Sequence, residues 1–235
     1  KRFLTTSGVA SEGWHLVTSP VNGQGINAMV GSFLTSGTKY SIAPYKNTVA
    51  TALRWDYYTS DVVNPITGAG NYIKAKGYSI KKATAGTLDF TGTLYTDNET
   101  IALTDGGDDP AGNRWNLIGN TYTASLHGNN AAHATNNFLK VNNDAGNLDP
   151  ARGGLYLWNG TSYDVKAVDD AAFYIAPGQA FFVHSKDGGG SSASFTEAMQ
   201  THQTGNIFLR NSTNYPEIIL NISDNTNNSS TKIRY

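Results

Sequence analysis

The chain has 235 residues, a net charge of −1, 15% charged residues and no cysteine. The near-neutral charge gives no field that would attract nucleic acid or an anionic membrane surface. The lack of cysteine excludes disulfides, thiolate metal sites and a cysteine nucleophile. No apolar run approaches the ~18 residues of a membrane-spanning helix, so no membrane span is expected.

The first half of the chain is predicted to be made of short strands, because its apolar residues alternate with a period of two. A strand begins at Trp14 and ends before Pro20 and the glycine-rich turn at 23–25. Residues 26–34 are expected to form a short helix or an irregular cover. Further strands are predicted at 40–42, 50–58, 71–75, 77–82, 86–94 and 100–103, the last of which is expected to close the first unit.

The second half opens after a connector at 105–113 that is rich in Gly and Asp, which are turn-forming residues. The polar segment 126–150 is expected to be a long surface excursion with one strand, at the apolar residues 138–141. Strands are predicted to follow at 154–158, 162–168, 172–176, 180–185, 192–197, 206–210, 216–222 and 230–235.

An internal repeat is predicted from landmarks that recur in the same order about 100 residues apart. The stretch 13–20, which contains Trp14, recurs in altered form at 114–120, which contains Trp115. The matched landmarks are Trp14 with Trp115, Trp55 with Trp158, Gly77 with Gly178 and Phe90 with Phe195.

The predicted fold class is all-β, a β-sandwich or jelly-roll-like architecture built from two repeated units of about 100 residues, since short strands and frequent turns favour such folds. The first repeat is placed at 1–104 and the second at 114–205. Residues 206–235 are terminal strands that complete the second unit or lead to a further domain. Both ends of the sequence are strand-like, so we expect other domains of a longer chain as partners.

Four stretches of the second unit carry a family resemblance: 115–120, 156–160, 175–183 and 195–199. They resemble a β-rich region of large secreted proteins of Bacteroidetes. In that group the region usually precedes the C-terminal sorting domain of the type IX secretion system. The resemblance is looser in the first unit, and the chain departs from the pattern at 121–123 and at Ala180. It implies secretion to the cell surface or medium and a non-enzymatic accessory, adhesive or structural role.

The candidate ligand-binding residues are aromatic side chains with polar neighbours, a combination typical of ligand sites. Aromatic faces can stack on pyranose rings, while Arg and Asp can bond to hydroxyl groups. Trp14 and Trp115 are expected to fill cores, and Trp55 and Trp158 to pack in a core or at an edge. The candidates are Arg54, Trp55, Asp56, Tyr57, Tyr58 and Tyr163.

A calcium site is one interpretation of Asp105, Asp108 and Asp109, because one loop could offer carboxylate and carbonyl oxygens. An ordinary Asx-type turn is the favoured interpretation, since Asp and Gly are also turn residues. His127 and His133 are expected to be solvated loop residues, because two histidines without a third ligand are poor evidence for zinc. No other cofactor is expected.

No catalytic signature occurs in the sequence, so we expect no enzyme and name no catalytic residue. The favoured function is a secreted or cell-surface module for adhesion or carbohydrate binding, with a polysaccharide or cell-surface glycan as partner. The alternative is a spacer or a self-assembling filament subunit, whose exposed edges at 207–209 and 218–222 would permit strand addition. A glycan-degrading enzyme ranks below both.

Overall fold

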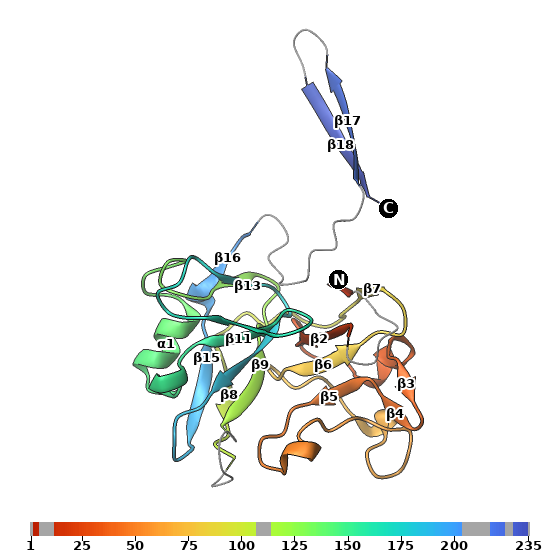
Figure 1. The fold of residues 1–235 in the computed structure, drawn as a ribbon, viewed down its shortest axis with the longest axis vertical. Coiled ribbons are helices and arrows are strands. Elements are labelled where there is room, and N and C mark those ends of the chain that lie inside the picture. The colour runs from red at the N-terminus through yellow and green to blue at the C-terminus, as the bar shows by residue number, and fades with distance from the viewer. Residues whose placement is uncertain (1, 5–11, 107–113, 204–216, 224–227, 235) are drawn as a thin grey trace.

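The protein is all-β, as predicted, in a computed structural model that describes residues 2–4, 12–106, 114–203, 217–223 and 228–234. Within these ranges the chain forms eighteen strands, one α-helix and five short 3-10 helices. The strands of every sheet pair antiparallel. Figure 1 shows the first half, in red to yellow, beside the second half, in green to blue.

The first half is organised around a three-stranded sheet in the order β2-β6-β5. Its buried cluster includes Ile26, Ile42, Tyr78 and Ile80, so both the sheet and the segment after β2 contribute to one core. The elements are β1 Arg2–Leu4, β2 Trp14–Val17, η1 Asn27–Ser32, β3 Thr35–Ser36, β4 Lys39–Tyr40, β5 Ile42–Pro44, η2 Thr51–Leu53, η3 Ile66–Gly68, β6 Tyr78–Lys81 and β7 Gly86–Leu88.

The second half is organised around a four-stranded sheet in the order β12-β11-β14-β9, with smaller sheets β13-β10-β16 and β15-β8. A hairpin of β17 and β18 lies in the predicted terminal region. The elements are β8 Glu99–Leu103, β9 Trp115–Gly119, β10 Ser125–His127, α1 Phe138–Asp144, η4 Pro150–Arg152, β11 Leu155–Trp158, β12 Tyr163–Lys166, β13 Tyr174–Ile175, β14 Ala180–His184, β15 Ser191–Phe195, η5 Glu197–Met199, β16 Gln200–Thr201, β17 Glu217–Ser223 and β18 Asn228–Arg234.

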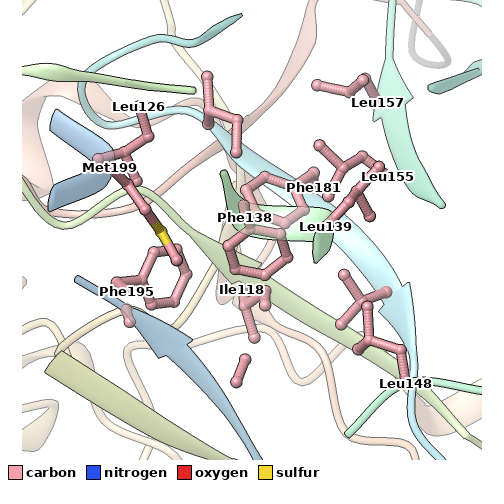
Figure 2. Close-up of a cluster of buried hydrophobic side chains, with 14 of the residues drawn as sticks. Ile118, Leu126, Phe138, Leu139, Leu148, Leu155, Leu157, Phe181, Phe195 and Met199 are labelled. Carbon is pink, nitrogen blue, oxygen red and sulfur yellow. The ribbon is translucent and has the colours of Figure 1, made fainter. Parts of the chain in front are cut away.

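The core of the second half lies between its sheets and α1 (Figure 2). Ile118, Phe181 and Leu155 come from the four-stranded sheet, Phe195 comes from β15, and Phe138 comes from the helix. All five side chains are buried. The ring of Phe138 lies 5.2 Å from that of Phe181 and 5.1 Å from that of Phe195, between centroids, so the helix fills the space between two sheets.

The prediction of a surface excursion with one strand at 126–150 is wrong, because residues 138–144 form the helix α1 instead. Asn137 begins the helix, and its side chain accepts a hydrogen bond from Lys140 N at 2.8 Å, which is a normal N-cap contact. Asn129 and Asn142 are fully buried. Their amides bond to main-chain groups of neighbouring segments, so these asparagines build the interior rather than a solvated loop.

The prediction of a strand over 50–58 is also wrong. Residues 51–53 form η2, and the chain folds back at once, because Lys46 N donates to Arg54 O at 2.8 Å. Residues 71–75, predicted as a strand, form no strand either; Asn71 makes only an isolated antiparallel bridge with Gly25. The strand predicted at 100–103 exists, but it pairs with β15 rather than closing the first unit.

The two halves meet at main-chain hydrogen bonds, which we call the seam. Thr18 N donates to Gly178 O at 3.0 Å, and Gly119 N donates to Ala75 O at 2.9 Å. Thr18 follows β2 and Gly119 ends β9, the strands that carry the matched tryptophans. In each half that strand pairs antiparallel with a later one, β2 with β6 and β9 with β14. These corresponding antiparallel pairs are compatible with a duplication, which itself stays a prediction.

Gly119→Ala should destabilise the protein, because the seam has no room for a side chain there. A Cβ at this position would lie 2.7 Å from Gln179 O and 2.7 Å from Thr18 Cγ2. We expect a loss of about 2 kcal/mol in the free energy of unfolding, measured by urea denaturation. Gly31→Ala is the matched control, since no atom lies within 4 Å of its added Cβ. Equal effects of the two substitutions would contradict this account of the seam.

Candidate ligand-binding site

An aromatic face of the four-stranded sheet forms the candidate site. Side chains alternate along a strand, so Leu157 of β11 and Phe181 of β14 point into the core of the second half. Tyr156 and Phe182 point to the opposite face, where they join Leu16 of the first half in a separate cluster. This face is therefore covered in part by the first half of the chain.

Phe182 lies at the centre of this face, with three aromatic rings packed against it at steep angles. The ring centroids of Tyr45, Tyr163 and Trp55 lie 4.9, 5.6 and 6.1 Å from its own. Edge-to-face contacts of this kind are favourable, because the positive edge of one ring meets the negative face of another. The rings leave open a pocket of about 230 Å³, the aromatic pocket. Its lining residues are Tyr45, Trp55, Trp115, Tyr156, Tyr163 and Phe182.

The first half contributes Tyr45 and Trp55, which pair across an isolated antiparallel bridge. Their rings lie 5.2 Å apart. An ion pair between Lys46 and Asp56 joins the next residue of each segment. Lys76 Nζ also donates to Tyr45 O at 3.2 Å, which ties this bridge to the segment beside the seam.

The second half positions Tyr163 through the turn between β11 and β12. The Asn159 side chain accepts hydrogen bonds from Thr161 N at 3.0 Å and from Ser162 N at 2.9 Å. Trp158 lies directly opposite Tyr163, and its Nε1 donates to Trp14 O at 3.1 Å, which ties the hairpin to the first half. Partial burial, with Tyr45 nearby, raises the pKa of Tyr163 to about 12, so its hydroxyl group stays protonated at neutral pH.

Of the six predicted ligand-binding residues, the structure brings together Trp55 and Tyr163 in the aromatic pocket. Asp56 is engaged by Lys46, and Tyr57 lines a different pocket. Tyr58 packs against the core of the first half. The remaining residue, Arg54, is half-buried, and its Nε donates to Val49 O at 3.4 Å.

The prediction that Trp14 and Trp115 fill cores is right only in part. Trp115 packs against the buried cluster of Leu117 and Phe182, but both tryptophans are only half-buried and each lines a pocket. The match of Trp55 with Trp158 stays a prediction, and the two residues lie in different surroundings. Trp158 lies on the strand that pairs with β14, whereas Trp55 lies on the segment that returns against Tyr45.

Sequence reasoning missed four lining residues, Tyr45, Trp115, Tyr156 and Phe182. The alternation of β11 and β14 contained the relevant signal, since Tyr156 and Phe182 stand next to core residues on the same strands. Such alternation shows which side chains share a face. It does not show that this second face is itself partly covered.

The calcium interpretation of Asp105, Asp108 and Asp109 stays a prediction, because Asp108 and Asp109 lie outside the described residues. Among the residues described, no group of three or more His, Asp or Glu side chains is arranged to hold a metal ion. His127 and His133, expected to be solvated, are half-buried instead, with ring centroids 4.9 Å apart.

A buried polar cluster supports Trp115 from behind. His184 is 1% exposed and lies against the Trp115 ring, with centroids 4.8 Å apart. Its Nδ1 lies 3.0 Å from Asp149 Oδ2, and its Nε2 lies 3.1 Å from Arg152 Nη1. Arg114 lies 3.8 Å from the same Asp149 carboxylate. Desolvation, followed by the positive charge of Arg152, lowers the pKa of His184, so the folded protein favours its neutral form.

The free energy of unfolding should therefore fall as the pH drops from 7 to 5. A histidine with a lowered folded-state pKa contributes stability above its unfolded pKa of ~6.5, and this contribution is lost as the pH falls through the folded pKa. His184→Gln should flatten the pH dependence, measured by urea denaturation at several pH values. The exposed His202 provides the control variant, His202→Gln. An equal pH dependence in both variants would rule out His184 as its source.

Comparisons with protein-family models, curated proteins and solved structures find no match to this chain. Among the described residues, no helix has both the length and the apolar character needed to cross a membrane.

Proposed function

We propose that the chain is a non-catalytic module that binds a neutral carbohydrate in the aromatic pocket. The observation that carries the proposal is the convergence of six aromatic side chains, from both halves, on one pocket of about 230 Å³. This size lies just below the ~300 Å³ at which drug-sized sites begin, so the pocket suits one or two sugar rings.

The chemistry of the lining supports a sugar as ligand. The C–H faces of a pyranose ring are apolar and match aromatic rings, while its hydroxyl groups need donors and acceptors. Tyr45, Tyr156 and Tyr163 carry phenolic hydroxyl groups, and Trp55 and Trp115 carry indole N–H groups, so each ring combines an apolar body with a polar tip. An aromatic lining favours stacking over acid–base catalysis, which in most glycosidases uses two carboxyl groups.

The resemblance of the second unit to secreted Bacteroidetes proteins supports an extracellular location for this activity. We propose that the module acts outside the cell, on the bacterial surface or in the medium, where adhesion to a polysaccharide would be useful. The low charged fraction of 15% suits a rigid extracellular β protein. The alternative role as a spacer or filament subunit stays a prediction, since its edge at 207–209 lies outside the described residues.

The test is retention of the purified chain on a panel of insoluble neutral polysaccharides, including cellulose and chitin. Tyr163→Ala and Trp55→Ala should each weaken retention at least fivefold, roughly 1 kcal/mol, as expected for an aromatic residue central to an interface. Tyr174→Ala is the control, because Tyr174 lies on β13 and packs against His127 instead.

Circular dichroism would establish that the variants are folded. If the native chain is retained on none of the polysaccharides, or if Tyr163→Ala and Tyr174→Ala behave alike, the proposal is wrong and the spacer role gains support.

A further inference from the structure

A second pocket, of about 200 Å³, lies in the first half beside β2, β6 and the hairpin of β3 and β4. We call it the lysine pocket. Its lining includes Trp14, Leu34, Lys39, Tyr40, Tyr57 and Lys81. Among the described residues that line it, none is acidic, and the one carboxylate next to Tyr57 in sequence, that of Asp56, is engaged by Lys46.

Local structure fixes the aromatic part of the lysine pocket. Trp14 and Lys81 lie directly opposite each other in the β2–β6 pair, so their side chains project from the same face. The Trp14 and Tyr57 rings lie 6.0 Å apart with an interplanar angle of 64°, and together offer two differently oriented surfaces. Asn64 Nδ2 donates to Tyr57 O at 2.7 Å, which holds the main chain under that ring.

Lys39 brings positive charge to the mouth of the pocket. It lies on β4 opposite Ser36, next to the turn at Gly37, and it is exposed. Its Nζ lies 5.9 Å from the centroid of the Tyr57 ring, within the range of a cation–π contact. An anionic group on a ligand ring held against Tyr57 would therefore meet an ammonium group that is already close by.

We propose that the lysine pocket is a second ligand site, which binds a sugar ring that carries a carboxylate, such as a uronic acid. The ring would stack on Trp14 and Tyr57, and the carboxylate would pair with Lys39. Charge complementarity distinguishes this site from the aromatic pocket, whose six lining residues are all uncharged aromatics. The chain would then contact acidic and neutral units of a polysaccharide at separate sites.

The inference does not depend on the aromatic pocket, because the two pockets share no lining residue. The experiment is isothermal titration calorimetry of the folded chain with trigalacturonate. Lys39→Gln and Tyr57→Ala should each lower the affinity at least about fivefold, and added salt should weaken binding to the native chain. Retention on neutral polysaccharide should not change in Lys39→Gln.

Two controls separate this site from general charge effects and from the aromatic pocket. Lys140→Gln removes a lysine of α1, in the second half, where Lys140 pairs with Asp144 of the same helix. This substitution should leave the affinity for trigalacturonate unchanged. Tyr163→Ala should leave it unchanged too. Absence of trigalacturonate binding at millimolar concentration, or equal affinities in Lys39→Gln and Lys140→Gln, would overturn the proposal.

Discussion

The seam between the halves is the contact on which the candidate site depends. Three main-chain hydrogen bonds cross it in both senses: Thr18 and Gly77 of the first half donate two of them, and Gly119 of the second half donates the third. Such bonds need the two backbones to come close, and the contacts that a Cβ at Gly119 or Gly77 would make show how little space remains. Only at this separation can Tyr45, from the first half, lie against Phe182, from the second. The aromatic pocket is thus a product of how the halves are joined.

The strands nearest the seam were also the easiest to predict from sequence. β2 and β9 each lie within the recurring motif. β6 and β14 contain runs of residues that are buried on both faces of the sheet. A strand buried on both faces, such as β14, gives a short continuous apolar run, and such a run predicts a strand even without alternation. The segment 50–58 misled for the opposite reason. Its aromatic residues favour a strand by composition, but they are only half-buried at a pocket and receive little sheet pairing.

The buried asparagines show a second limit of sequence reasoning. Asn129 donates to Asp170 O at 2.9 Å and accepts from Phe173 N at 3.1 Å, which satisfies groups that would otherwise lack partners in the interior. Asn142 links α1 to Ser194 of β15 in the same way. Composition alone makes such residues look like a solvated loop, because the same side-chain amide hydrogen-bonds to water at a surface and to main-chain groups in the interior. Only the three-dimensional partner distinguishes the two cases.

Each pocket is lined by one of the two matched tryptophans, Trp14 or Trp115, and the residue opposite each tryptophan illustrates how the two pockets differ in chemistry. Lys81 lies opposite Trp14 and lines the lysine pocket, whereas His184 lies opposite Trp115 and is enclosed by Asp149 and Arg152. A charged residue remains part of the lining in the first case, while in the second a neutral histidine supports the tryptophan from behind. If the predicted duplication is real, the halves kept the strand pairing that the seam requires and diverged in the side chains that face a ligand.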